Sequence, residues 1–390
     1  MTKNHKDPFR KKSIKVPFFY PSISAKDIKS ATNALKSPLL TDGPKLREFE
    51  KQFARFAKAK FAIGVSNATS ALHLSLNAIG IKKGDEVIIP NLTFVATASS
   101  VLLAGATPRL VDVDADDMNI SVESFKRNIS NKTKAVIPVH FAGKACKIQE
   151  IKKIARKNNI AIIEDCAHAI GAKILNKHVG TFGDTGCFSF YPTKNITTIE
   201  GGMILTNNKN LARYLEMARN HGISRNLSKR YQSGRPWDYD IQFPGHNYRL
   251  DEIRSSIGVS QLSQIKKFNL KRNVAYKYYN KEFRKIRGIT TPEDPERDNV
   301  CHLYILKIEK EFGITRNELF ERLLKDGIQT SVHYKPLSMF SVFKSNGKIT
   351  ESLKNSLELY EKMISIPFFP DITKKEQNQV IKCIKIAQKK

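Results

Sequence analysis

The residue with the clearest chemical potential is Lys194, in the stretch GCFSFYPTKNITTIEGG at residues 186–202. An apolar run, 186–191, carries Ser189 and leads into a loop that Pro192 restrains. Apolar surroundings lower the pKa of a lysine amine below its free value of about 10.4, so more of the amine is neutral and able to attack a carbonyl group. A lone lysine in a loop is usually solvated. These neighbours are not typical of a surface lysine, and they predict a nucleophile.

A second reactive position is Asp165, in IAIIEDCAHAIGA at residues 160–172. Asp165 follows an apolar run, which predicts that it lies where a strand ends, and His168 comes three residues later. A carboxylate there can keep a pyridine nitrogen protonated and so strengthen the ring as an electron sink. A cap for a following helix explains Asp165 equally well. Glu164 and Cys166 are expected on the opposite face of the strand.

Two further stretches could bind anions or substrates. Thr69 and Ser70, in SNATSALHL, are predicted at the start of a helix, where free amide groups and the helix dipole favour a phosphate. Both residues are also ordinary helix caps and need bind nothing. The stretch FPGHNYRLDEI crowds Asn247 and Arg249 into a turn, which by itself could be any polar turn.

These positions are predicted to share one edge of a sheet. Between about residues 60 and 220, short β-branched runs alternate with amphipathic segments, which is typical of a mostly parallel sheet with helices on both faces. Leu72, Leu76 and Ile79 have helical spacing and should face that sheet. Ligands of such sheets gather at the carboxyl ends of the strands. The predicted strands are 61–65, 85–90, 107–113, 134–140, 160–165, 186–191 and 202–206.

The pattern changes after Asn247, where a helix is predicted at 261–283, followed by short strands and helices. We therefore expect a large α/β domain at residues 1–250, which includes a basic segment at 1–20, and a smaller α+β domain at 251–390.

Composition limits the protein's class less than the motifs do. The net charge of +29 would suit nucleic acid, an anionic membrane or a phosphorylated substrate, but the lysines are spread over every predicted helix, as on solvated faces. No run approaches the ~20 apolar residues of a membrane span, and no secretory signal is recognisable, so a soluble, cytoplasmic enzyme is expected. The spacing of the cysteines predicts reduced thiols and neither a disulfide framework nor a metal site; they are Cys146, Cys166, Cys187, Cys301 and Cys383.

Nine segments together closely resemble the DegT/DnrJ/EryC1/StrS family of nucleotide-sugar aminotransferases. The resemblance runs from LTDGPKLREFE through SNATSALHL, PNLTFVATA, PVHFAG, EDCAHAIGA, SFYPTKNITTIEGG, GHNYRLDEI and GIQTSVHYKP to ISIPFFPDIT. It implies the aspartate aminotransferase-like fold of pyridoxal 5'-phosphate enzymes. It also implies a homodimer with shared active sites.

The resemblance implies a role for each matched position. Lys194 would bind the cofactor covalently and move protons between substrate and cofactor, and Asp165 would pair with the pyridine nitrogen. His168 would lie near the cofactor hydroxyl, and Phe94 would stack on the ring. The remaining residues would hold the phosphate (Thr69, Ser70, Ser189, and Asn247 from the neighbouring subunit) or the nucleotide and sugar (Arg249, His333, Tyr334).

The implied reaction moves an amino group from L-glutamate to a keto-sugar on a nucleotide diphosphate, for amino-sugar and surface polysaccharide synthesis. The run ITTIEGG favours C4 amination of a 4-keto-6-deoxy hexose, and C3 amination stays open. Related 3-dehydrases carry histidine where Lys194 stands, and a basic, non-catalytic nucleic-acid binder is the remaining alternative. The chain departs from the family at Ala68 and Ile199, where glycine is usual, and at Ser338, where relatives often have histidine.

Overall fold

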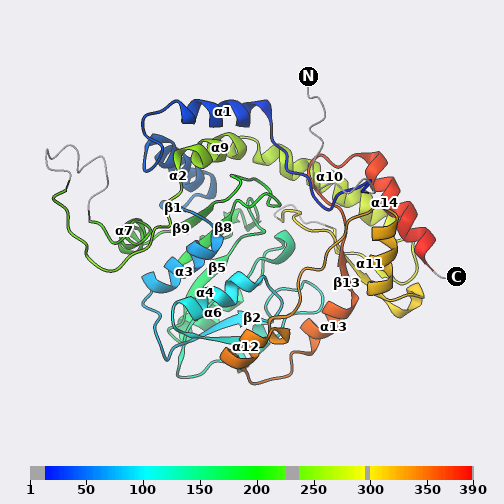
Figure 1. The fold of residues 1–390 in the computed structure, drawn as a ribbon. Coiled ribbons are helices and arrows are strands. Elements are labelled where there is room, and N and C mark those ends of the chain that lie inside the picture. Colours follow the sequence, from blue (N-terminus) through cyan, green and yellow to red (C-terminus); the bar gives the residue numbers. More distant parts are fainter. Residues whose placement is uncertain (1–13, 225–236, 295–298, 389–390) are drawn as a thin grey trace.

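The computed structural model describes residues 14–224, 237–294 and 299–388 and is built on one eight-stranded sheet (Figure 1). Residues 1–13 of the predicted basic segment lie outside that description. β9 runs antiparallel to both of its neighbours, and the other pairs are parallel. The seven predicted strands and the mostly parallel sheet are therefore confirmed. The spatial order is β1 (Phe61–Val65), β9 (Gly202–Thr206), β8 (Thr185–Ser189), β5 (Ala161–Asp165), β4 (Thr133–Val136), β2 (Glu86–Pro90), β3 (Thr107–Val111) and β12 (Lys348–Ile349).

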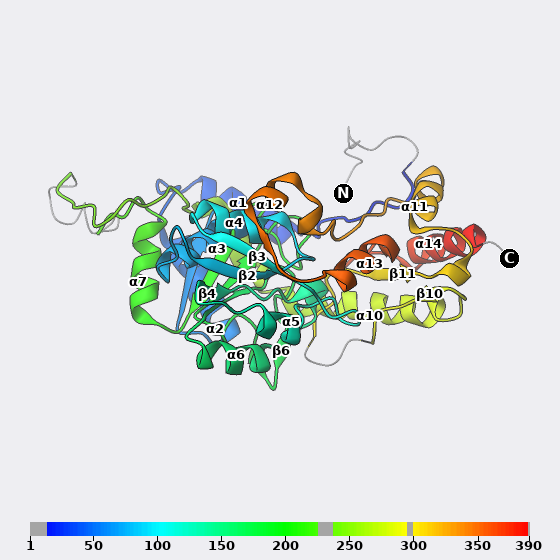
Figure 2. The same cartoon turned by 90° about the horizontal axis from the view of Figure 1, so that it is seen from below.

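Helices cover both faces of this sheet, above and below it in Figure 2. Side chains alternate across each strand, so Val87 and Ile89 pack with Leu72 and Leu76 of α3, while Ile88 packs on the other face. Burial of Leu72 and Leu76, with Ile79 packed against the same cluster, confirms the predicted helix face. One layer contains α3 (Ala68–Ala78), α4 (Val95–Leu103) and α7 (Lys209–Ala218); the other contains α2 (Pro44–Ala57), α5 (Val122–Arg127) and α6 (Ile148–Lys157).

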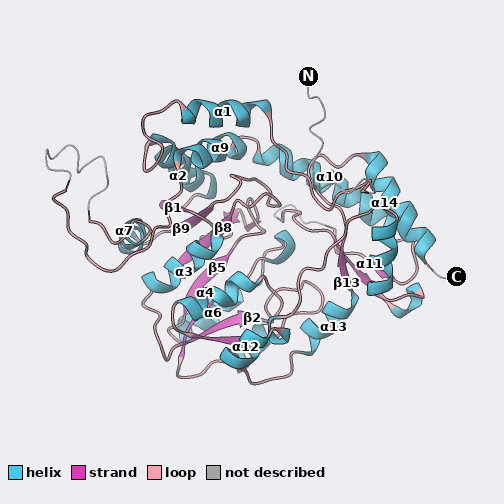
Figure 3. Ribbon diagram, viewed as in Figure 1, coloured by secondary structure: helices cyan, strands magenta, loops and turns pink. Residues whose placement is uncertain are grey.

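The C-terminal part adds a small antiparallel sheet covered by long helices (Figure 3). Its core is aromatic, with Tyr279, Phe283, Tyr304 and Phe312 fully buried. The sheet has the order β10 (Ile289–Thr290), β11 (Ile305–Ile308) and β13 (Met363–Ser365), and the helices around it include α10 (Ile265–Phe283), α11 (Arg316–Lys325), α13 (Lys354–Lys362) and α14 (Lys374–Ala387).

The helix predicted at 261–283 begins four residues later than expected. α9 (Glu252–Leu262) ends first, and α10 starts at Ile265 after a turn at 263–264. Gln261 and Gln264 donate to the two carboxylate oxygens of Asp27 in α1 (Ala25–Leu35), at 2.8 and 3.2 Å. This tertiary contact fixes the turn, and neither glycine nor proline marks it in the sequence.

The division into two domains between residues 250 and 251 stays a proposal. Two sets of contacts cross this boundary. α9 packs against α1 and α2 of the N-terminal part. β12 joins the large sheet beside β3, where Lys348 pairs with Arg109. The remaining elements are short: β6 (Lys173–Ile174), β7 (Lys177–His178), α12 (Ser341–Asn346) and three 3-10 turns.

Glu164 ties the central strand β5 to the loop that precedes β8. Its carboxylate is fully buried on the face opposite Asp165, as predicted. One oxygen accepts from the backbone N–H groups of Phe182 and Gly183, at 2.7 and 2.8 Å. The other accepts from Gly180 N–H at 2.8 Å and lies 3.0 Å from His140 Nε2. Four contacts thus compensate one buried charge.

We predict that Glu164→Ala lowers the free energy of unfolding by about 3 kcal/mol or more, because buried donors lose their acceptor and His140 loses its partner. Urea denaturation followed by circular dichroism measures the change. Exposed Glu321→Ala on α11 is the control and should change stability by less than about 0.5 kcal/mol. Equal stability of the two variants would contradict the role assigned to Glu164.

Candidate active site

The first part of the site is the start of α3, directly after β1. Asn67 caps this helix, because its side-chain oxygen accepts from Ser70 N–H at 2.8 Å. Thr69 and Ser70 lie in the first turn, and the Ser70 hydroxyl is 2.9 Å from Ser66 Oγ. Ala68 is helical and has negative φ, so alanine in place of the family glycine causes no strain. The turn can cradle an anion with amide and hydroxyl groups.

The second part of the site is Ser189, which lies near the start of α3 because β9 pairs with β8. Ser189 is the last residue of β8 and pairs with Gly202 of β9. A Cβ atom at Gly202 would lie 2.5 Å from the carbonyl carbon and oxygen of Asn67, so only glycine allows this approach. Ser189 therefore lies one strand away from the cap of α3, and its hydroxyl belongs to the same edge as Thr69 and Ser70.

Asp165 ends β5 at this edge and is 6% exposed. Its oxygens accept from the Thr97 hydroxyl and from Ala167 N–H, both at 3.1 Å. No ion pair involves Asp165 among the described residues, and burial raises its pKa while nearby Lys194 opposes the rise. Residues 166–172 form turns and no helix, so the helix-cap interpretation is wrong. A buried carboxylate whose hydrogen-bond donors are both neutral could form an ion pair with a protonated ring nitrogen.

Lys194 lies in the turn after β8, which closes through a hydrogen bond from its own N–H to Tyr191 O at 2.9 Å. The side chain is half-buried. Burial lowers the pKa of the Lys194 amine to about 8, and the charge of Asp165 acts in the opposite direction. The direction matches the sequence prediction, and a sizeable fraction of the amine is neutral near physiological pH.

His168 is buried beside these groups and has both ring nitrogens engaged. Nδ1 accepts from Ala142 N–H at 3.3 Å, and Nε2 lies 3.0 Å from the Tyr334 hydroxyl. Burial, and after it the charge of Lys194, holds the pKa of His168 well below its usual range, so the ring is neutral. The ring of Phe94 lies 5.7 Å from that of Tyr334 and is half exposed, as a ring that covers a ligand would be.

Three other predicted residues are less closely connected. His333 Nδ1 lies 2.8 Å from Ser365 Oγ, and burial and Lys194 lower the pKa of His333 to about 4. Asn247 is exposed, and Arg249 donates to Asn220 Oδ1 at 2.6 Å. No hydrogen bond or ion pair within the described part of the chain joins Asn247 or Arg249 to Asp165 or Lys194.

Sequence reasoning missed two residues of this site. Thr97 binds Asp165 and is 2.9 Å from Thr93 Oγ1, one helical turn earlier. The four-residue spacing of Thr93 and Thr97 was the available signal. His302 is buried, with its ring centroid 4.4 Å from that of His168, and nothing local in the sequence marks it.

A candidate metal cluster next to the site is already engaged by hydrogen bonds. His140, Glu164 and Cys166 bring three possible ligand atoms within 4.8 Å of one another. His140 Nδ1, however, accepts from Cys146 N–H at 3.1 Å, and Nε2 faces Glu164. The cluster therefore stabilises the fold. All five cysteines are buried, and none of them forms a disulfide in the structure.

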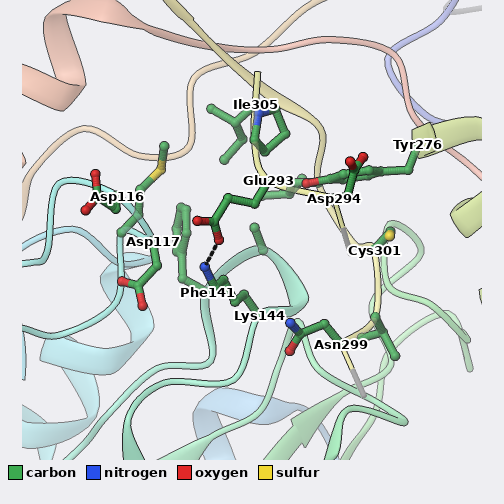
Figure 4. A pocket seen from close by; sticks show the side chains of 15 residues that line it. Asp116, Asp117, Phe141, Lys144, Tyr276, Glu293, Asp294, Asn299, Cys301 and Ile305 are labelled. Carbon is green, nitrogen blue, oxygen red and sulfur yellow. Dashed lines mark hydrogen bonds and ion pairs between the residues drawn. The ribbon is translucent and has the colours of Figure 1, made fainter. Parts of the chain in front are cut away.

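A pocket lies between the Phe141 loop and the C-terminal part (Figure 4). Lys144 forms an ion pair with Glu293 inside it, and Asp116 and Asp117 form another part of its wall. None of the predicted site residues lines it. Two of its lining residues also contact His168: the Phe141 ring lies 5.9 Å from the His168 ring, and Ala142 N–H donates to His168 Nδ1 at 3.3 Å.

Ile199 has left-handed backbone geometry, with φ +72, and is 57% exposed. A β-branched residue is strained there, and a glycine is not. Its N–H is held by Thr197 Oγ1 at 2.9 Å, and the Thr197 hydroxyl donates to Phe190 O, also at 2.9 Å. The left-handed backbone at this position explains why glycine is usual there in the family. Ile199 adopts the same backbone geometry at a cost in strain.

Comparison with known proteins places the chain among sugar-modifying enzymes. The profile of the DegT/DnrJ/EryC1/StrS aminotransferase family matches residues 21–385. An uncharacterized protein of Methanocaldococcus jannaschii is 41% identical over 95% of this chain and 97% of its own. The spore coat polysaccharide biosynthesis protein SpsC of Bacillus subtilis is 34% identical over 96% and 98%.

A solved structure gives the same result. Spr1654 of Streptococcus pneumoniae, named as a sugar aminotransferase and solved in its PMP form, superimposes with a TM-score of 0.89 at 28% identity, over 95% of this chain and 98% of that one. Its PLP form superimposes with a TM-score of 0.87. The aspartate aminotransferase-like fold implied by the sequence is thereby confirmed. No helix in the described ranges is long and apolar enough to cross a membrane.

We predict that Ile199→Gly raises the midpoint of urea denaturation, because release of left-handed strain is worth about 1 kcal/mol after the added entropy of glycine in the unfolded chain. Ile199→Ala is the matched control. It removes the branch but keeps the Cβ atom that causes the strain, so its midpoint should stay near that of the wild type. A midpoint for Ile199→Gly below that of Ile199→Ala would show that Ile199 is not strained.

Proposed function

Since the chain belongs to the DegT/DnrJ/EryC1/StrS aminotransferase family, we propose that it transfers the amino group of L-glutamate to C4 of a 4-keto-6-deoxy hexose linked to a nucleotide diphosphate. It is a pyridoxal-phosphate-dependent transaminase. The observation that carries the proposal is the pairing of a lysine of low pKa, Lys194, with a buried carboxylate, Asp165, at one edge of the sheet.

The residues at this edge fit pyridoxal phosphate by charge and by donor type. Thr69, Ser70 and Ser189, together with the free amides of α3, would hold the phosphate. Asp165 would pair with the ring nitrogen, which would give this buried carboxylate the direct ion pair that it does not form with any described residue. When bound, pyridoxal phosphate supplies the electron sink that makes the C–H bond beside the amino group acidic. Phe94 would cover the ring.

Lys194 Nζ then moves the proton. A neutral amine can accept the proton from the carbon that carries the amino group of the donor, and the resulting ammonium can return it on the other side of the reacting bond. A pKa of about 8 leaves Nζ able to act in both directions near neutral pH. His168 stays neutral and adds no competing cation near Asp165.

The acceptor is proposed to be a nucleotide sugar for surface polysaccharide synthesis. The similarity to SpsC and Spr1654 supports a sugar, and a net charge of +29 suits a diphosphate. C3 amination is the alternative regiochemistry. Dehydration is disfavoured, because it would need histidine in place of Lys194. We further propose a cytoplasmic homodimer in which the exposed Asn247, with Arg249, reaches the site of the neighbouring subunit, and in which His333 contacts the substrate.

We predict that the purified protein with pyridoxal phosphate forms a visible absorption band of the lysine-bound cofactor, and that L-glutamate bleaches it toward the absorption of the amine form. Lys194→Ala should form no such band, because it has no amine to hold the cofactor. The exposed Lys209→Ala is the control and should behave as the wild type. Absorption spectra before and after glutamate measure both steps.

Two other outcomes have distinct meanings. A band that forms but resists glutamate would remove glutamate as donor and keep the cofactor site. No band in the wild type would remove the role of Lys194 and favour the basic nucleic-acid binder, whose affinity for DNA should then fall steeply with salt.

We also predict the pH dependence of cofactor uptake by the cofactor-free protein. The lysine must be neutral to attack the aldehyde, so the rate should rise with pH and level off above pH about 8, the pKa of Lys194. Stopped-flow absorbance between pH 6 and pH 10 measures it. A rate that still climbs steeply at pH 10 would show that Lys194 has an ordinary pKa.

A further inference from the structure

Tyr334 stands out because its hydroxyl contacts a protein side chain of the site. Its Oη lies 3.0 Å from His168 Nε2. The other ring nitrogen of His168 accepts from Ala142 N–H, so the single proton of the neutral ring is on Nε2 and is donated to the Tyr334 oxygen. Ala142, His168 and Tyr334 thus form one directed chain of hydrogen bonds.

The segment that carries Tyr334 is fixed at both ends. Ser331 exchanges backbone hydrogen bonds with Ser365 of β13, at 2.9 and 2.7 Å. At the other end, Leu337 N–H donates to Asn91 O and Ser338 N–H donates to Asn91 Oδ1, both at 2.8 Å. Asn91 directly follows β2 of the large sheet. The strap 331–338 therefore spans from the small sheet to the large one and carries Tyr334 between two anchored ends.

The ring of Tyr334 is also confined. It lies 5.7 Å from Phe94, 6.2 Å from Phe141 and 6.0 Å from His168, measured between ring centroids. Burial raises the pKa of the Tyr334 hydroxyl well above its usual range, so the phenol stays protonated. Since burial also lowers the pKa of His168, the contact between the two side chains is a neutral hydrogen bond near neutral pH.

We propose that Tyr334 is a positioning residue that acts on the cofactor through His168, rather than a contact for the sugar. Without the hydroxyl, the Nε2–H of His168 would be buried with no acceptor, and the ring would keep only its long bond from Ala142. His168 would then be free to turn away from the cofactor. This inference rests on the proposed function, since it assigns a role within the same site.

The test uses the glutamate half-reaction, in which no sugar takes part. A sugar contact would leave this step unchanged, whereas a residue that orients His168 affects it. In Tyr334→Phe with bound pyridoxal phosphate, we expect glutamate to bleach the visible band about tenfold more slowly, as for the loss of one buried hydrogen bond. We also expect the pH midpoint of that band to shift by about one unit.

Two further variants separate positioning from general damage. Tyr360→Phe is matched, because Tyr360 is partly buried against the same hydrophobic cluster and its hydroxyl makes no hydrogen bond in the described chain; it should behave as the wild type. In a His168→Asn background, Tyr334→Phe should have no additional effect on the rate or the midpoint, because the two residues act as one unit.

The inference is overturned if Tyr334→Phe bleaches at the wild-type rate with an unchanged band, or if its effect is the same with and without His168. A failure of the proposed function would show in the wild type, and so can be told apart from a failure of this inference. If glutamate does not bleach the wild-type band, the donor is wrong, and the pH midpoint of the band, which needs only bound cofactor, still decides the role of Tyr334.

Discussion

One buried carboxylate, that of Asp165, constrains much of this molecule. Asp165 lies at the end of the central strand β5, with only a threonine hydroxyl and one backbone N–H as direct hydrogen-bond donors. The neighbouring Glu164 is buried just as deeply but is compensated by three backbone N–H groups and His140. Glu164 and Asp165, adjacent acids on opposite faces of one strand, thus differ in how fully the protein compensates their charge. The fold itself satisfies Glu164, whereas Asp165 has two direct donors and no ion pair among the described residues, so a further cationic group could still pair with it.

The sheet order then determines what can surround Asp165. β8 lies directly beside β5, so the turn after β8 delivers Lys194 to the neighbourhood of the carboxylate. β9 reverses direction next to β8, and Gly202 lets the start of α3 approach closely enough for its amides to share an edge with Ser189. A side chain at Gly202 would push α3 away. The proposed phosphate site and the proposed reactive lysine would therefore both result from the same strand arrangement.

Much of this could be predicted from sequence, because its signals are local. The seven strands, the helix face of Leu72 and Leu76, and the placement of Asp165 at a strand end follow from hydrophobic pattern alone. The break between α9 and α10 could not be predicted, since it depends on Asp27, more than 230 residues away. His302 and the bond between Tyr334 and His168 depend in the same way on how distant segments meet. The family resemblance named Tyr334 as a candidate for the substrate, and the hydrogen bond to His168 is information that a motif does not carry, because a motif records position and not the atom that a side chain touches.

The residues after Asp165 that the family resemblance assigned to the site differ in how closely they connect with it. Asn247 is exposed and Arg249 donates to Asn220, so neither residue contacts the cluster around Asp165 within the described chain. Tyr334 is different, because the strap 331–338 is anchored to Asn91 at one end and to β13 at the other. A shift of the small sheet relative to the large one would be transmitted through this strap to His168. On the proposed role of Tyr334, the orientation of the His168 ring would be coupled to the packing of the two sheets, and the remote contact of Ser331 with Ser365 would help to hold the site in order.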